Sequence, residues 1–228
     1  MGKKNLVLLI IFFAITLLSS YFIFVATNHS FSLKTVDSVK AKKLMIVAHP
    51  DDETIWGGSH LLEDKYLVVC ITCGSNEIRA REFTKVMADA KTEYIMLGYP
   101  DLVDGEKSKW EKERKDIERD IKKIINTKDW ELIVTHNTAG EYGHIHHILT
   151  NQIVTETYEN LKPSGKLYYF GRYYTKQEIE NMKEKPKATD NKTVDKKEEL
   201  LSGYKTQDKV LELLEHMFPY EDWYEYNK

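Results

Sequence analysis

The stretch Leu44-Met45-Ile46-Val47-Ala48-His49-Pro50-Asp51-Asp52-Glu53 decides the fold of this 228-residue chain. Its first half is a short apolar run, as expected of a strand that is buried on both faces of a sheet. Its second half places an imidazole and three carboxylates directly where that strand ends. Because ligands of parallel sheets bind beyond the carboxyl ends of the strands, a functional site is expected here.

Further apolar runs and amphipathic segments alternate along the chain. Strands are expected at 66–72, 131–135 and 167–170, and helices at 79–97, 110–125 and 148–161. Strands that alternate with helices predict right-handed βαβ units. The predicted fold class is therefore α/β, a single domain with a mostly parallel sheet flanked by helices.

The N-terminal segment differs from the rest of the chain. Residues 6–26 contain no charge, and at a rise of about 1.5 Å per residue such a helix crosses a hydrocarbon core of about 30 Å. We expect a transmembrane anchor at 1–26, a tether at 27–42 and a catalytic domain at 43–228. A cleaved signal peptide, whose apolar region is usually shorter, is the alternative.

The flanking charges predict how such an anchor is oriented. Lys3 and Lys4 precede the apolar run, which places the N-terminus in the cytoplasm and the domain on the extracytoplasmic side of the membrane. Lysines on the far side, including Lys42 and Lys43, weaken this prediction. The formal net charge of −3 without a dense basic stripe argues against nucleic acid as a partner.

A second polar cluster follows the strand expected at 131–135. Five of the eight histidines of the chain come just after these two strands: His49, His136, His144, His146 and His147. A turn after Pro50 can bring the side chains of His49 and Asp52 to one point. Imidazole nitrogen and carboxylate oxygen are ligands suited to zinc or ferrous iron, and three protein ligands with an open position are typical of catalytic zinc.

Together, Ala48–Glu53 and Gly140–His147 resemble the two motifs of the LmbE/PIG-L-like metal-dependent deacetylases, which act on N-acetylglucosamine units. The resemblance covers about residues 43–207, including segments near Arg79, Asp101 and Tyr204. It implies a Rossmann-like domain and zinc-dependent hydrolytic de-N-acetylation, in which metal-bound water attacks the amide. Ferrous iron is the alternative metal. The implied partner is an N-acetylated amino sugar, lipid-linked or wall-associated.

The resemblance also implies roles for individual residues. His49, Asp52 and His147 would ligate the metal, and Asp51 would act as general base. His144 would stabilise the oxyanion and protonate the leaving amine.

Three further positions follow from the same resemblance. Arg79 and Asp101 would contact the substrate. His146 stands where many relatives have Asp, a residue expected to orient a histidine, so the protonation state of His144 is left open.

Two other activities fit the same motifs. The chain could be an amidase for a different small amide, although an anchor is of no use for a cytosolic precursor. It could instead be an inactive sugar-binding module that retains the metal, although such a module has no need of Asp51 and His144.

Three local patterns carry no catalytic chemistry. Cys70 and Cys73 form a C-x-x-C that starts inside a strand, which favours two buried thiols over a redox pair, with a disulfide left open. Gly57-Gly58 predicts a tight turn. Residues 182–199, rich in charged residues and containing Pro186, predict a mobile loop.

Overall fold

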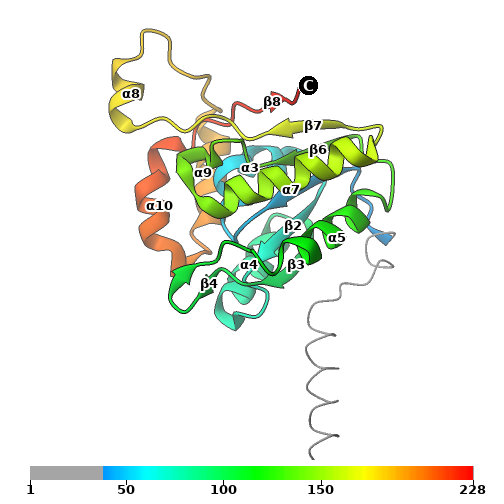
Figure 1. Ribbon diagram of the computed structural model, residues 1–228. Coiled ribbons are helices and arrows are strands. Elements are labelled where there is room, and N and C mark those ends of the chain that lie inside the picture. The colour runs from blue at the N-terminus through cyan, green and yellow to red at the C-terminus, as the bar shows by residue number, and fades with distance from the viewer. Residues whose placement is uncertain (1–37, 228) are drawn as a thin grey trace, which may run out of the picture. The chain divides into compact units, whose positions relative to one another are not determined.

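A computed structural model describes residues 38–227 as an α/β fold built on one sheet (Figure 1). Five strands run parallel, and β8 pairs antiparallel at one edge, in the order β3-β2-β1-β6-β7-β8. The strands are β1 Lys43–Val47, β2 Tyr66–Thr72, β3 Glu93–Tyr99, β6 Leu132–Thr135, β7 Lys166–Tyr169 and β8 Tyr224–Glu225. A separate hairpin consists of β4 Leu102–Val103 and β5 Glu106–Lys107.

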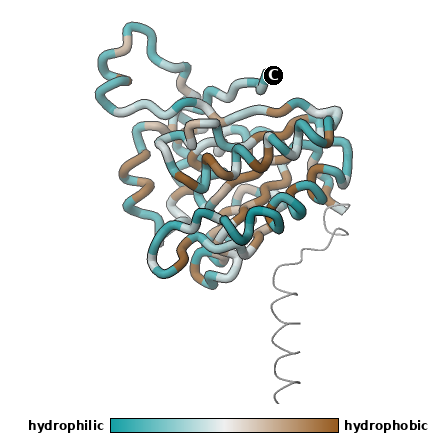
Figure 2. Tube along the Cα trace, in the orientation of Figure 1, coloured by the Kyte–Doolittle hydropathy of each residue, from teal (hydrophilic) through white to brown (hydrophobic). Residues whose placement is uncertain are grey.

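The helices cover both faces of this sheet. On one face α3 (Asp52–Glu63) and α4 (Glu77–Asp89) pack against α9 (Asn191–Leu201), and on the other α5 (Arg114–Ile125) packs against α7 (Ile145–Leu161). Apolar residues concentrate along the strands, whereas α5 is mostly hydrophilic apart from its buried isoleucines (Figure 2). The shorter helices are α6 Gly140–Gly143, α8 Lys176–Asn181 and α10 Asp208–Leu214, with 3₁₀ turns at Lys205–Gln207 and Glu215–Met217.

Strand β1 positions the site. Its neighbours are β2 on one side and β6 on the other, with Ile46 in register with Val69 and Thr135. The chain order reverses between β2 and β6, so the carboxyl end of β1 lies at a topological switch point, where α/β sheets bind ligands. The motif that follows β1 therefore emerges beside the polar segment that follows β6.

The prediction of a helix at 79–97 is wrong beyond Asp89, where α4 ends. The backbone reverses at Lys91, which has φ 53°, and residues from Glu93 onward form the edge strand β3, paired with β2. Tyr94 packs against Phe83 at 5.4 Å between ring centroids, a contact that a continuous helix would not allow because the two residues would be about 16 Å apart along its axis. Periodicity could not reveal that β2 offers backbone groups that pair with this segment.

The loop expected at 182–199 is wrong from Asn191 onward, where α9 begins. Asp190 caps this helix by accepting the N–H of Thr193 at 3.1 Å. Lys197 is fully buried, and its Nζ donates to the carbonyl of Ile55 at 2.7 Å and to Glu221 at 2.5 Å. A charged composition predicts solvent exposure, but this ammonium group is paired inside the fold.

The glycine pair Gly57-Gly58 lies inside α3 and forms no turn. A Cβ on Gly58 would lie 2.9 Å from Cγ of Lys197, and a Cβ on Gly57 would lie 2.6 Å from Cε of Met45. The glycines therefore allow α3 to approach both α9 and the sheet closely.

The anchor expected at 1–26 lies outside the described residues, as does most of the tether. Among residues 38–227, no helix is both long and apolar enough to cross a bilayer.

Candidate metal centre

The turn after β1 is strained. Asp51 has φ 117°, a conformation that costs a non-glycine residue about 1–3 kcal/mol and is held in place by its surroundings. Its carbonyl accepts the N–H groups of Thr54 and Ile55 at 3.0 and 2.8 Å, so α3 begins at once. The backbone N–H of His49 donates to Oδ2 of Asp52 at 2.7 Å. The turn therefore holds the side chains of His49 and Asp52 together, as the sequence predicted.

The first turn of α7 supplies a third group to this point. His49, Asp52 and His147 are buried, and one candidate ligand atom from each lies within 4.8 Å of the other two. Nδ1 of His49 lies 3.2 Å from Oδ2 of Asp52, and Nε2 of His147 lies 3.1 Å from Oδ1. The structure thus brings the three predicted metal ligands together around one carboxylate.

His147 fits a metal for a specific reason. Its Nδ1 lies 2.5 Å from Oε2 of Glu141. Burial raises the pKa of Glu141, but His136 and His147 lower it to about 2, so this carboxylate is ionised and can only accept. Nδ1 of His147 therefore carries a hydrogen, and the buried Nε2 points to Oδ1 of Asp52 at 3.1 Å. A cation between Nε2 and Asp52 would satisfy both.

The pKa of His147 also indicates a site for a cation. Burial lowers the pKa of His147, but Asp52 and Glu141 raise it to about 10. Two carboxylates around one imidazole thus favour a positive charge at this position. A divalent metal ion supplies that charge when it displaces a proton from the histidine.

Glu141 was not predicted from the sequence. It accepts hydrogen bonds from three groups: Nδ1 of His147, Nδ1 of His136 at 2.9 Å and the backbone N–H of Asn137 at 2.8 Å. His136 in turn accepts the N–H of Ala48 at 3.0 Å through Nε2, which occupies that lone pair and ties the end of β6 to the end of β1. The signal in the sequence was an acid between two glycines just before the histidines.

His144 and Asp51 lie beside the cluster. The ring of His144 is 4.7 Å, between centroids, from the rings of both His49 and His147. Its Nδ1 accepts the N–H of His146 at 3.2 Å, capping α7. Burial and the neighbouring histidines lower the pKa of His144 to about 2, which keeps the ring neutral. Burial and the charge of Asp52 raise the pKa of Asp51.

The two predicted substrate residues form an ion pair at the edge of the centre. Nη1 of Arg79 lies 3.2 Å from Oδ2 of Asp101, and its Nη2 donates to the carbonyl of Pro50 at 3.1 Å. Oδ1 of Asp101 is 3.5 Å from Nε2 of His49. The Asp101 side chain is 27% exposed, so this pair faces both the cluster and solvent.

The cysteines are free and buried, as predicted. Sγ of Cys73 accepts from Nη1 of Arg79 at 3.2 Å. Burial raises the pKa of both Cys70 and Cys73, so neither is a reactive thiolate.

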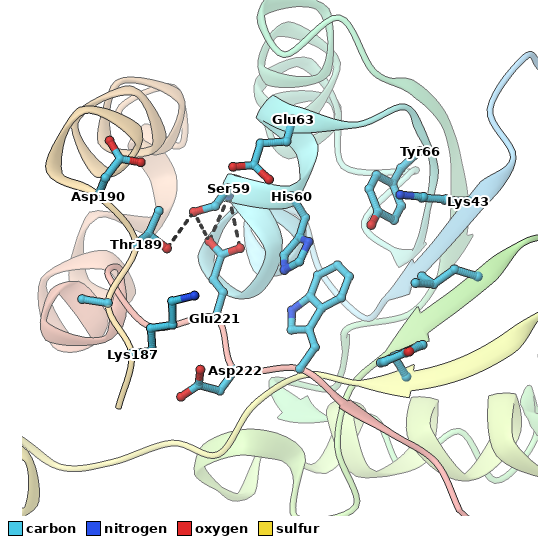
Figure 3. Close-up of a pocket in the computed structure, with 14 residues that line it drawn as sticks. Lys43, Ser59, His60, Glu63, Tyr66, Lys187, Thr189, Asp190, Glu221 and Asp222 are labelled. Carbon is cyan, nitrogen blue, oxygen red and sulfur yellow. Dashed lines mark hydrogen bonds between the residues drawn. The ribbon is translucent and has the colours of Figure 1, made fainter. Parts of the chain in front are cut away.

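A cavity of about 660 Å³ lies elsewhere on the domain (Figure 3). Lys43 and Tyr66, at the amino ends of β1 and β2, are among the residues that line it. It is therefore at the opposite end of the strands from the metal centre and contains none of the predicted site residues.

Comparisons with known proteins bear on this site. A family model described as PIG-L: GlcNAc-PI de-N-acetylase matches residues 44–158, a range that contains every predicted site residue. Uncharacterized protein L374 of Acanthamoeba polyphaga mimivirus is 32% identical over 148 residues, which are 58% of this chain and 63% of that relative. The chain thus spans less than two thirds of the length of that relative.

A solved structure with a similar fold is GalB, the 4-carboxy-2-hydroxymuconate hydratase from Pseudomonas putida KT2440. It matches with a TM-score of 0.55 and 16% identity, over 77% of this chain and 83% of GalB. At this identity the likeness concerns the fold.

Proposed function

Because this chain belongs to the PIG-L (GlcNAc-PI de-N-acetylase) family, we propose that it is a metal-dependent hydrolase that removes the acetyl group from an N-acetylglucosamine unit. The observation that carries this proposal is the buried cluster of His49, Asp52 and His147, in which one nitrogen of each imidazole lies within 3.2 Å of the Asp52 carboxylate. Two imidazoles around one buried carboxylate form a site that a divalent cation fits when it displaces a proton from His147.

The donor set favours zinc, with ferrous iron as the alternative. His49, Asp52 and His147 offer two imidazoles and one carboxylate, a mixed set suited to either ion. When bound, the ion supplies a Lewis acid that polarises the amide carbonyl and acidifies water.

Asp51 is the proposed general base. It follows the ligand His49 by two residues and directly precedes the ligand Asp52, on a strained turn that fixes its position. Its carboxylate accepts a proton from water as the oxygen attacks the amide carbon. Base assistance of this kind typically contributes about 10²–10⁴ in rate.

His144 is the proposed oxyanion donor. Because Nδ1 of this neutral ring accepts the N–H of His146, its hydrogen is on Nε2. Donating that hydrogen to the developing oxyanion is worth about 10²–10³ in rate. The sequence assigned protonation of the leaving amine to His144, but the lowered pKa keeps this ring neutral, so we propose that the amide nitrogen takes up the proton that Asp51 accepted. The C–N bond then breaks, and acetate and a free amine are released.

The surroundings of the centre support an amino sugar on an apolar carrier. Arg79 and Asp101 offer charged groups to sugar hydroxyls. Neighbours of these two residues in the sequence, Ile78, Leu102 and Val103, are exposed apolar residues, with exposed fractions of 59%, 57% and 47%. We propose a lipid-linked or wall-associated substrate outside the cytoplasmic membrane, which also fits the apolar run at 6–26.

Acetate release tests this proposal. The full-length protein in detergent would be assayed with and without zinc on N-acetylglucosamine, chitooligosaccharides and N-acetylglucosaminyl-phosphatidylinositol, alongside Asp51→Ala. We expect zinc-dependent release that the substitution abolishes. Sugar binding without acetate release from any of these substrates, with zinc shown to be bound, would favour the sugar-binding module instead.

A further inference from the structure

His146 lies in the core of the site, although the proposed chemistry does not use it. Its ring is fully buried. Nε2 lies 2.6 Å from the carbonyl oxygen of Ser108, and Nδ1 lies 2.9 Å from Nε2 of His49. The residue therefore connects a predicted metal ligand to a backbone carbonyl in the segment between β5 and α5.

This connection determines which nitrogen carries each hydrogen. The Ser108 carbonyl can only accept, so Nε2 of His146 must donate. In a neutral ring, Nδ1 of His146 is then an acceptor, and Nε2 of His49 donates to it at 2.9 Å. Oδ1 of Asp101, 3.5 Å from both nitrogens, can also only accept and therefore agrees with a hydrogen on Nε2 of His49. Nδ1 of His49 is left with its lone pair, and this is the atom that lies 3.2 Å from Oδ2 of Asp52.

Packing fixes the His146 ring in this orientation. The ring stacks on Trp110 with centroids 4.5 Å apart and planes 6° apart. Trp110 is itself buried, and its Nε1 donates to the carbonyl of Pro100 at 2.8 Å. The backbone N–H of Ser108 donates to the carbonyl of Asp101 at 2.9 Å. The acceptor and the stacking surface therefore belong to one hydrogen-bonded loop.

We propose that His146 is a positioning residue that orients His49 and keeps its Nδ1 free to bind the metal. The inference rests on the proposed metal-dependent function. It assigns two tasks to the start of α7, where His147 supplies one ligand and His146 orients another. The backbone N–H of His146 donates to Nδ1 of His144, whereas the ring of His146 contacts His49. Outer hydrogen-bond partners of this kind are typically worth 10–100-fold in metal affinity or activity.

Two substitutions separate the hydrogen bond from the packing. His146→Phe keeps an aromatic ring against Trp110 but removes both ring nitrogens. His146→Asn loses the ring but retains an amide oxygen that can accept from His49. His216→Phe is the matched control, because Nε2 of His216 also meets a carbonyl, that of Tyr174 at 2.9 Å, outside the metal centre.

The readouts are zinc affinity by chelator competition, zinc stoichiometry and the melting temperature of the zinc-free protein. We expect His146→Phe to weaken zinc binding about 10–100-fold at one zinc per chain, with little change in melting temperature. His146→Asn should recover most of the affinity, and His216→Phe should leave it unchanged. Unchanged affinity in His146→Phe, or no recovery in His146→Asn, would overturn the proposal.

Nitrogen-15 spectra of histidine in the zinc-loaded wild-type protein give a test that needs no variant. We expect both His49 and His146 to carry hydrogen on Nε2. Zinc bound directly to His146, or a second zinc held by His49, His144 and His146, would refute the positioning role. If the affinities behave as expected but no acetate is released, the proposed reaction fails and the positioning role stands.

Discussion

Nδ1 of His147 lies 2.5 Å from Oε2 of Glu141, a residue with φ 54° in the turn that precedes α7. The same carboxylate also accepts from His136, so a single buried acid orders both histidines. An outer carboxylate that orients a ligating histidine raises its basicity and fixes its tautomer. Glu141 thus orders the histidines of the candidate metal centre through its hydrogen bonds.

Replacing Glu141 with Gln should weaken zinc binding about 10–100-fold, since the neutral amide has one accepting oxygen, and its NH₂ group would meet either the backbone N–H of Asn137 or the two imidazole N–H groups. Chelator competition measures the affinity. Glu63→Gln, on the exposed end of α3, is the control and should bind zinc as the wild type does. Equal affinities in the two variants would show that Glu141 has no part in holding the metal.

Asp51→Asn should lower the rate of acetate release about 10²–10⁴-fold and leave zinc bound, because the base is lost and the ligands remain. Asp52→Asn, one residue away, should instead lose zinc. Metal content and turnover would be measured on the same samples. Full activity in Asp51→Asn would remove this residue from the mechanism.

Lys197→Met should destabilise the fold by about 3–5 kcal/mol, because it leaves the carboxylate of Glu221 buried without its cation. Glu221 also accepts from the backbone N–H of Ser59 at 2.9 Å, and Figure 3 shows the hydrogen bonds between Ser59 and Glu221. Urea unfolding measures the change. Lys196→Met, exposed on the same helix, should have little effect, and the double variant Lys197→Met/Glu221→Leu should recover part of the loss.

The substitution Leu102→Asp tests the proposed apolar carrier. Loss of about 1 kcal/mol of apolar contact would lower kcat/KM for a lipid-linked substrate about fivefold and leave a short, soluble analogue unaffected. Leu213→Asp, on α10, is the matched control, because Leu213 is 60% exposed and Leu102 is 57% exposed. A similar loss on both substrates would argue against a carrier contact at the β4–β5 hairpin.

Part of this protein could be predicted from local sequence. The apolar run 44–48 and the polar residues after it indicated a buried strand that ends in a site, and the predicted metal ligands His49 and Asp52 are three residues apart. Such features depend on neighbours in the chain, which the sequence displays directly.

Other features depend on what packs against a segment. Helical spacing continues through Tyr94, yet residues 93–99 form a strand because the free edge of β2 pairs with their backbone. The lysine-rich stretch around Lys197 suggested solvent exposure, and Glu221, 24 residues further on, makes its burial possible.

The sequence by itself determined the α/β class, the two motifs and the residue types able to hold a metal. Only the tertiary structure decided how those groups are oriented. Glu141 holds the hydrogen on Nδ1 of His147, which directs Nε2 to the metal. Ser108, acting through His146, holds the hydrogen on Nε2 of His49, which directs Nδ1 to the metal. A tautomer depends on the acceptor that lies opposite each ring nitrogen, and folding alone brings that acceptor into place.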